Sequence, residues 1–187
     1  MKTLTILFSD LKGFTETSEK LGPQEIGNVL NDYFSAMNEV IFEHGGTIDK
    51  FIGDAIMVFF GAPKSLDPKT QAEQAAACGL AMQHKMRDLS RQWSEKGAQN
   101  LDMRIGVHQG QAVVGNFGSK ERMDYTCIGP SVNLASRIES VCEPGQVYIS
   151  QPVAVLLNQD ASEEVGSFSL KGITDEQTLF RCLARRF

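Results

Sequence analysis

Two apolar runs of strand length each carry an aspartate at one end. The run TLTILFSD, residues 3–10, ends with Asp10. In KFIGDAIMVFF, residues 50–60, Asp54 precedes six consecutive apolar residues. Short apolar runs bounded by glycine and polar residues are typical of buried β-strands, and an uninterrupted run indicates a strand covered on both faces. The sequence therefore predicts two core strands, each with a carboxylate at one end.

The segments around these strands alternate between helical and strand-like patterns. Apolar residues recur at helical spacing through residues 24–43, between Pro23 and Gly45-Gly46, which favour the start and the end of a helix. A second, alanine-rich helix is predicted at 70–93. The other predicted elements are strands at 4–9, 47–51, 55–60, 125–128 and 146–150, a hairpin of 103–108 and 111–117 around Gln109-Gly110, helices at 132–141 and 152–157, loops at 61–69 and 94–100, and a β-like tail.

This order, β-α-β-β-α-β followed by C-terminal additions, indicates an α+β fold with a ferredoxin-like core. The chain has 187 residues and suits one domain, residues 1–187. In this topology the third strand lies antiparallel between the first and the second, so the end of the first strand is beside the start of the third. Asp10 and Asp54 occupy those two positions. We therefore predict that two carboxylates distant in sequence meet at one edge of the sheet.

The composition argues against some functions. A net charge of −5 gives no general attraction to nucleic acids or to membrane surfaces, so we expect neither as a partner. The four cysteines form no CxxC pair, which favours buried, reduced thiols in a cytosolic protein. No segment has the length of a bilayer span or the pattern of a signal peptide. We expect a cytoplasmic domain, even where a longer protein carries a membrane anchor.

Each of the two aspartates alone has a structural explanation. Asp10 could cap the following turn, and Asp54 could shape a Gly-Asp hairpin. Two uncompensated carboxylates held close together repel each other, however, and a bound cation is the usual relief. Such a pair can hold two divalent cations, an arrangement suited to phosphate chemistry. After the first strand, Gly13 and its neighbours can present backbone N–H groups to a phosphate.

Four segments carry a family resemblance. They are FSDLKGFT (8–15), KFIGDAIMVFFG (50–61), MRIGVHQGQAVVGNFGS (103–119) and YTCIGPSVNLASRIE (125–139). Together they resemble the class III nucleotidyl cyclases, the family of adenylate and guanylate cyclases, in the family's order and over nearly the whole chain. The resemblance implies the class III cyclase fold and a reaction in which the ribose 3′-oxygen attacks the α-phosphorus of the same nucleotide and pyrophosphate leaves.

The resemblance implies roles at the predicted sheet edge. Asp10, Asp54 and the backbone carbonyl of Leu11 match the family's metal ligands, which hold two Mg²⁺ or Mn²⁺ ions per active site. Two metals suit this chemistry, because one activates the 3′-hydroxyl and the other neutralises the leaving group. In the turn after the first strand, Gly13, Phe14 and Thr15 are expected to bind the substrate.

Asn133 and Arg137 lie four residues apart on a predicted helix, so both face one side. They match the family's Asn-x-x-x-Arg pair, in which Asn orients the ribose and Arg stabilises charge on the α-phosphate. A planar, bidentate guanidinium suits that task. Without the other motifs, a surface Arg paired with a carboxylate such as Glu139 is the simpler interpretation. Lys171, in SLKG, matches a family lysine that holds the terminal phosphates.

Two further positions concern the choice of base. Lys50 matches the position that is Lys in adenylate cyclases and Glu in guanylate cyclases, and a Lys donor suits the N1 acceptor of adenine. Thr126 matches the second base-reading position, where adenylate cyclases commonly carry Asp; a threonine hydroxyl can accept but can also donate. Lys with Thr resembles a subgroup of cyanobacterial and soluble mammalian adenylate cyclases. The resemblance implies ATP as substrate and suggests a bicarbonate response as a hypothesis.

The resemblance also implies a head-to-tail homodimer. The family builds each site across the interface, with metals from one chain and Asn, Arg and phosphate-binding Lys from the other. The sequence leaves alternatives open: a guanylate cyclase making cyclic GMP, or a non-catalytic nucleotide-sensing dimerisation domain. A diguanylate cyclase has a similar core, but GGTID at 45–49 replaces its GGDEF signature. The expected function is thus an adenylate cyclase that converts ATP to 3′,5′-cyclic AMP and pyrophosphate.

Overall fold

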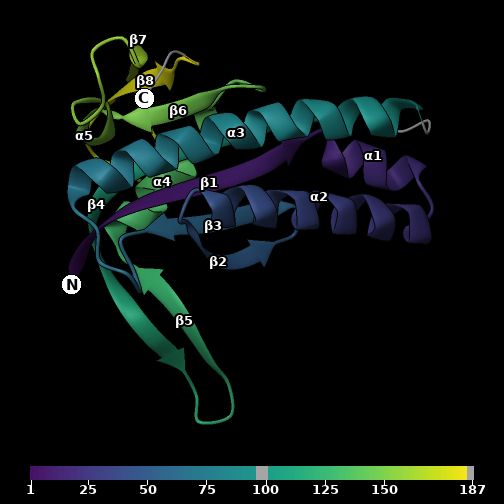
Figure 1. Ribbon diagram of the computed structural model, residues 1–187, viewed down its shortest axis with the longest axis horizontal. Coiled ribbons are helices and arrows are strands. Elements are labelled where there is room, and N and C mark those ends of the chain that lie inside the picture. The colour runs from purple at the N-terminus through teal and green to yellow at the C-terminus, as the bar shows by residue number, and fades with distance from the viewer. Residues whose placement is uncertain (96–100, 185–187) are drawn as a thin grey trace.

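The first strand lies in the middle of the sheet. The computed structural model describes residues 1–95 and 101–184. Its strands are arranged in the order β2-β3-β1-β4-β6-β8-β7, and β5 pairs with β4 outside this row (Figure 1). Their bounds are β1 (Lys2–Lys12), β2 (Thr47–Ile52), β3 (Ala55–Phe60), β4 (Asp102–Gly118), β5 (Met123–Ile128), β6 (Val147–Ser150), β7 (Ser162–Phe168) and β8 (Gln177–Cys182).

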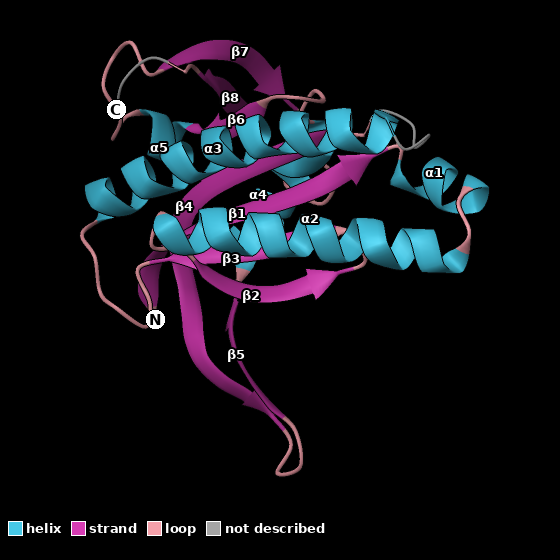
Figure 2. Cartoon of the chain, turned by 45° about the vertical axis from the view of Figure 1, so that its right-hand side comes forward, coloured by secondary structure: helices cyan, strands magenta, loops and turns pink. Residues whose placement is uncertain are grey.

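Helices cover both faces of the sheet. They are α1 (Phe14–Lys20), α2 (Pro23–Glu43), α3 (Pro68–Glu95), α4 (Pro130–Val141) and α5 (Gln151–Ala154). The long helices α2 and α3 lie side by side on one face, and α4 lies on the other (Figure 2). None of the described helices combines the length and the hydropathy needed to cross a bilayer.

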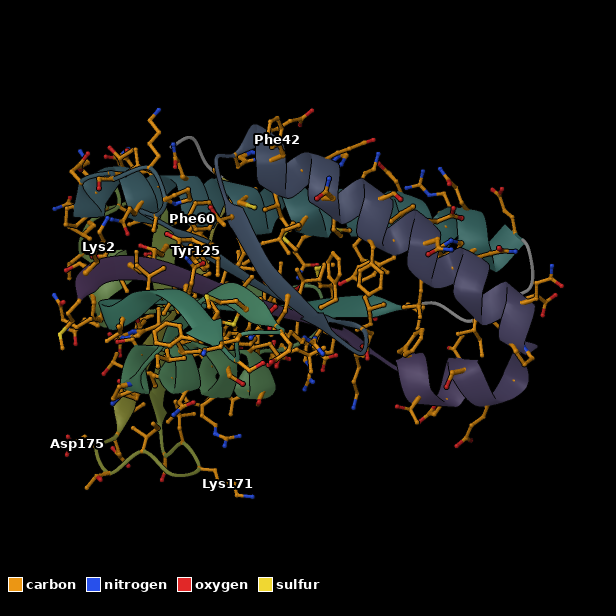
Figure 3. All side chains as sticks on the ribbon, turned by 90° about the horizontal axis from the view of Figure 1, so that it is seen from below. Lys2, Phe42, Phe60, Tyr125, Lys171 and Asp175 are labelled. Atoms are coloured by element: carbon orange, nitrogen blue, oxygen red, sulfur yellow. The ribbon has the colours of Figure 1, made fainter. Side chains whose placement is uncertain are left out.

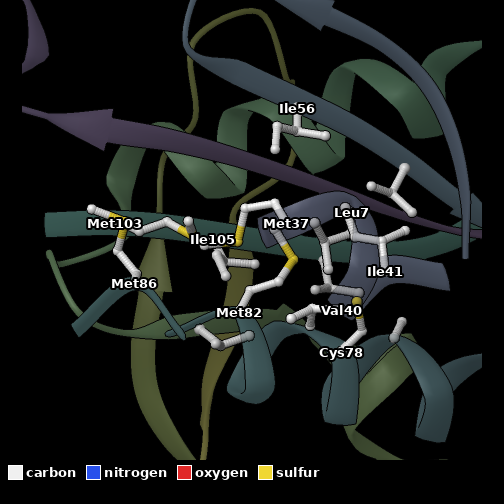
Figure 4. Packing of buried hydrophobic residues seen from close by; sticks show 14 of the residues in the cluster. Leu7, Met37, Val40, Ile41, Ile56, Cys78, Met82, Met86, Met103 and Ile105 are labelled. Atoms are coloured by element: carbon white, nitrogen blue, oxygen red, sulfur yellow. The ribbon is translucent and has the colours of Figure 1, made fainter. Parts of the chain in front are cut away.

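Alternate residues of β1 supply both cores, because successive side chains of a strand point to opposite faces. Leu7 and Leu11 pack in the core beneath α2 and α3, which contains Met37, Met82 and Met86 (Figure 4). Leu4, Ile6 and Phe8 belong to the core on the α4 side. Burial on both faces explains the three consecutive apolar residues Ile6, Leu7 and Phe8.

The predicted ferredoxin-like core is confirmed. β3 lies between β2 and β1, antiparallel to both, and β4 is antiparallel to β1 on its other side. Ser9 pairs with Ile56, so the end of β1 is beside the start of β3. The C-terminal additions form β7 and β8 at the far edge of the sheet, as the β-like tail predicted.

The predicted hairpin around Gln109-Gly110 is wrong, because β4 runs through both residues as one strand of 17 residues. Gln109 pairs with Thr5, and its buried side chain donates to the Thr5 hydroxyl at 2.8 Å. Gly110 is needed for close approach, since a Cβ there would lie 2.3 Å from the Ser131 hydroxyl oxygen. Glycine therefore marked a crowded position in a strand, and the pattern was misread as a turn.

The hairpin lies further along, where β4 returns into β5. This two-stranded arm projects from the body of the molecule (Figure 1). Four of its apolar side chains are exposed: Val113, Met123, Tyr125 and Ile128. The sequence prediction also lacked α1, which directly follows β1. The helix predicted to end at residue 93 continues to Glu95, and the rest of the predicted loop 94–100 lies outside the described residues.

Candidate active site

The two aspartates at the ends of the apolar runs meet, as predicted. Asp10 lies near the end of β1, and Asp54 lies in the tight turn between β2 and β3, after Gly53, whose φ of +62° is favourable for glycine. The Asp54 carboxylate accepts the backbone N–H of Leu11 at 3.0 Å. This bond ties the turn to the end of β1 and holds the two carboxylates together. Their role as metal ligands stays a prediction.

The electrostatics of the pair fit a cation. Burial, together with the neighbouring Asp10, raises the pKa of Asp54 from 3.8 to about 6. The protein thus holds a partly desolvated carboxylate beside a second one, and a divalent cation would relieve both costs. No group of three or more His, Cys, Asp and Glu side chains surrounds a common point within the described ranges. A metal here would take two carboxylates, the Leu11 carbonyl and oxygens from a ligand.

A stability measurement can detect this repulsion without metal. Because the folded-state pKa of Asp54 lies above 3.8, the folded protein binds more protons between about pH 4 and pH 6, so its stability falls as pH rises through that window. Asp54→Asn keeps an acceptor for Leu11 and removes the charge. At pH 8 with a chelator we expect it to raise the free energy of unfolding by about 1 kcal/mol, a value discounted because the carboxyl is half-exposed.

Urea unfolding at pH 8 and pH 4 measures the gain, which should vanish at pH 4. Asp67→Asn is the matched control, since hydrogen bonds from Thr70 lower the pKa of Asp67 and its removal should give no gain. Equal stability of Asp54→Asn and the unsubstituted protein at pH 8 would contradict the proposed repulsion.

Arg104 joins the site, which the sequence analysis missed. Its guanidinium donates to the Asp10 carboxylate at 2.7 Å and lies 3.2 Å from Glu139. The pairing of β1 with β4 places Arg104 opposite Asp10, so their side chains share one face of the sheet. The signal was the register of two strands far apart in sequence, which neither strand reveals alone.

Glu139 comes from α4 on the same face. A Cβ on Gly106 of β4 would lie 2.2 Å from the Glu139 backbone nitrogen, so glycine lets the helix lie directly on the strand. Burial raises the pKa of the Glu139 carboxyl to about 7, while the Arg104 charge opposes that rise. Arg104 therefore lies between two carboxylates, that of Asp10 on β1 and that of Glu139 on α4.

The Asn133/Arg137 face of α4 is exposed, whereas Ala135, Ile138 and Glu139 are buried against the sheet. The pairing of Arg137 with Glu139, the simpler interpretation, is wrong because Glu139 faces Arg104. Within the described ranges, the side chains of Asn133 and Arg137 make no hydrogen bond or ion pair with another residue. One protomer thus brings Asp10 and Asp54 together but does not join Asn133 and Arg137 to them.

Lys171 extends into solvent from the loop between β7 and β8 (Figure 3). Gly13, with φ of +86°, precedes α1, and Phe14 and Thr15 form the first turn of that helix. The chemical groups at these positions suit contacts with phosphates, because an ammonium and the backbone N–H groups at a helix start both attract anions. Their roles as substrate ligands stay predictions.

Lys50 and Thr126 come together through a residue that the sequence analysis did not single out. The Thr126 hydroxyl donates to the Asp49 carboxylate at 2.6 Å, and the Cys127 backbone N–H donates to the same oxygen at 3.1 Å. The Lys50 ammonium lies 3.3 Å from the other oxygen. The Asp49 side chain is 0 % exposed and that of Lys50 is 44 % exposed. No local sequence pattern indicated these contacts, because Asp49 resembles an ordinary polar residue of a strand.

A groove of about 450 Å³ adjoins these residues. It lies between the end of β5 and the start of α4 and is lined by Cys127, Ile128, Gly129, Pro130, Val132 and Asn133. Its polar lining is sparse, and Asn133 stands at one side of it. The groove therefore extends from Cys127, which follows Thr126, to Asn133 on α4.

Comparison with known proteins identifies the family. The model of the adenylate and guanylate cyclase catalytic domain matches residues 1–182. This chain belongs to that family. The cyclase domain is 38 % identical over 174 residues to an adenylate cyclase of Anabaena cylindrica, covering 91 % of this chain and 33 % of that protein. It is 37 % identical over 138 residues to adenylate cyclase 1 of Rhizobium meliloti, covering 74 % and 20 %.

Solved structures include both nucleotide specificities. The adenylyl cyclase CyaB from P. aeruginosa has a TM-score of 0.96 and 41 % identity, covering 99 % of the cyclase domain and 95 % of that chain. The guanylyl cyclase Cya2 has a TM-score of 0.90 and 44 % identity, covering 97 % and 91 %. The cyclase domain spans a third or less of the length of the two curated relatives.

Proposed function

We propose that the cyclase domain is an adenylate cyclase that converts ATP to 3′,5′-cyclic AMP and pyrophosphate. The observation that carries the proposal is the close pair of carboxylates, Asp10 and Asp54, at the end of β1, held by the hydrogen bond from Leu11 to Asp54. Two carboxylates held together in a partly buried place cost folding free energy, and such a pair suits a site that binds cations together with phosphates. The four free cysteines are buried, which supports a reducing compartment such as the cytoplasm.

Asp10, Asp54 and the Leu11 carbonyl are the residues that would hold two Mg²⁺ or Mn²⁺ ions. Oxygen ligands of this type are those that hard divalent cations prefer. When bound, such ions lower the pKa of the ribose 3′-hydroxyl and neutralise charge on the triphosphate. Arg104 donates to Asp10 and so fixes its carboxylate at the edge of this site.

The remaining residues position the nucleotide. Arg137 has no partner among the described residues, so its fork is available to bind two oxygens of an α-phosphate as charge grows there. Asn133, one helical turn earlier and beside the groove, would hydrogen-bond the ribose and align the 3′-oxygen for attack. Lys171 and the backbone of Gly13, Phe14 and Thr15 would hold the terminal phosphates.

The proposed active form is a head-to-tail C2 homodimer. Among the described residues, no hydrogen bond or ion pair joins the exposed side chains of Asn133 and Arg137 to Asp10 or Asp54, and in this proposal a second copy of the chain completes the site. The exposed apolar side chains of the β4–β5 arm, with Phe51 and Ile52 on the neighbouring β2, support an interface there. A two-fold arrangement would then create two equal sites.

A guanylate cyclase is the second candidate, favoured by the likeness to the guanylyl cyclase Cya2. Lys50 argues for ATP, because its ammonium can donate to adenine N1, whereas guanine N1 carries a hydrogen and needs an acceptor. The assay is purified protein with ATP or GTP and Mn²⁺, with the cyclic product identified by mass. We expect cyclic AMP from ATP at the higher kcat/KM. A preference for GTP would overturn the assignment of base, and silence with both would overturn the proposed activity.

A further inference from the structure

We infer that Asp49 is a positioning residue that fixes Thr126 as a hydrogen-bond acceptor toward the nucleotide base and so favours adenine over guanine. The inference rests on the proposed function and names what reads the base within that site. A threonine hydroxyl alone is ambiguous, because it can donate one hydrogen bond and also accept. The contacts of Asp49 remove this ambiguity.

The Asp49 carboxylate accepts two hydrogen bonds through one oxygen and lies beside an ammonium with the other. One oxygen receives the Thr126 hydroxyl at 2.6 Å and the Cys127 N–H at 3.1 Å, and the other faces the Lys50 ammonium at 3.3 Å. A distance of 2.6 Å is typical of a charge-assisted O–H···O⁻ bond. A carboxylate accepts and does not donate, so the proton of this bond belongs to Thr126. The Asp49 side chain is 0 % exposed, so water does not compete with it for the Thr126 hydroxyl.

Because the Thr126 hydroxyl proton is donated to Asp49, Thr126 can act only as an acceptor toward a ligand. Its oxygen keeps lone pairs but has no second hydrogen to donate. The 6-amino group of adenine donates and would be matched, whereas the 6-oxo group of guanine accepts and would face another acceptor. Lys50 imposes the complementary condition at N1. Asp49 fixes the reading at Thr126 and need not touch the base itself.

The test is a double-mutant cycle on substrate selectivity, the ratio of kcat/KM for ATP to that for GTP, measured with full-length protein. Asp49→Asn keeps the shape of the side chain but removes the charge that holds the Thr126 proton, and its amide can donate as well as accept, so the Thr126 hydroxyl is no longer restricted to one direction and can donate toward guanine. We expect selectivity to fall about tenfold, mainly through KM. Thr126→Val removes the hydroxyl, so the selectivity should fall by a similar factor. Thr126→Ser keeps a hydroxyl and should retain the selectivity of the unsubstituted protein.

Coupling between the two sites separates positioning from a general structural role. If Asp49 acts through Thr126, adding Asp49→Asn to Thr126→Val should change selectivity by less than about twofold. Asp67→Asn is the matched control, because Asp67 also accepts a threonine hydroxyl at 2.6 Å and an N–H at 3.0 Å, but on the surface at Thr70. It should leave selectivity unchanged.

Three results would overturn the inference: Asp49→Asn with unchanged selectivity, a full additional loss from Asp49→Asn in the Thr126→Val background, or Thr126→Val with unchanged selectivity. The last applies even if Asp49→Asn does not fold. Binding of 3′-deoxy-ATP and 3′-deoxy-GTP, which cannot cyclise, gives a second readout of the same ratio. Protein that makes no cyclic nucleotide would refute the proposed function, whereas the binding ratio would still test Asp49.

Discussion

Asp54→Ala and Arg137→Ala proteins should each be nearly silent alone, at least about a hundredfold below the unsubstituted enzyme, yet regain activity when mixed. In the proposed function, the first variant would lack a metal ligand and the second would lack the cation that meets the α-phosphate. If each site takes its metal ligands from one protomer and its arginine from the other, half of the randomly reassembled dimers carry one intact site. The mixture should then reach about a quarter of the unsubstituted rate.

The matched control mixes Asp54→Ala with Asp10→Ala. Both substitutions affect the metal-binding half, so every site in the mixed dimer lacks one carboxylate and activity should not return. Rates are measured as cyclic AMP formed with ATP and Mn²⁺, after the subunits have been allowed to exchange. Recovery in the control, or none in the test mixture despite proven exchange, would argue against sites shared between protomers.

Lys50→Glu should give the second large effect, a loss of about a hundredfold in kcat/KM for ATP. The substitution replaces a donor to adenine N1 by an acceptor. It also replaces the ammonium that lies 3.3 Å from the buried Asp49 carboxylate by a second carboxylate. The new carboxylate can accept from guanine N1–H, so GTP should suffer much less and the ATP-to-GTP selectivity should fall.

Lys69→Glu provides the control for charge alone. Lys69 is exposed on α3 and pairs only loosely, at 3.7 Å, with Glu73, so its reversal should leave both nucleotides unaffected. Steady-state kinetics with ATP and GTP decide the outcome, and thermal unfolding verifies that both variants fold. Unchanged selectivity in Lys50→Glu would disprove the assignment of Lys50 to the base.

The sequence predicted the elements whose patterns are local. β1, β3, α2 and α3 have long apolar runs or sustained helical spacing, and the topology that follows from their order brought Asp10 and Asp54 together. Prediction failed where a residue had two physical explanations. Gly110 was interpreted as a turn glycine, but it lies within a strand, where Ser131 of α4 leaves no room for a side chain. Only the position of that helix distinguishes the two explanations.

The candidate site shows the same division. Asp10, Asp54, Asn133 and Arg137 stand in recognisable segments and were predicted as site residues; the structure confirms that Asp10 and Asp54 meet, and the roles of all four stay predictions. Arg104, Glu139 and Asp49 were not, because their significance arises from strand register, from a helix lying on Gly106, and from contact between β2 and β5. Such pairings are fixed by the assembled sheet, and a single sequence does not encode them in any short segment.

The unbroken course of β4 links parts of the site mechanically. Near its start it carries Arg104 beside Asp10, in its middle Gly106 supports α4, and near its end Gly115 pairs with Thr126. A hairpin at residue 109 would have put a hinge between these groups. The continuous strand instead holds these groups on one element, so a displacement of β4 would move Arg104, the helix α4 and Thr126 together.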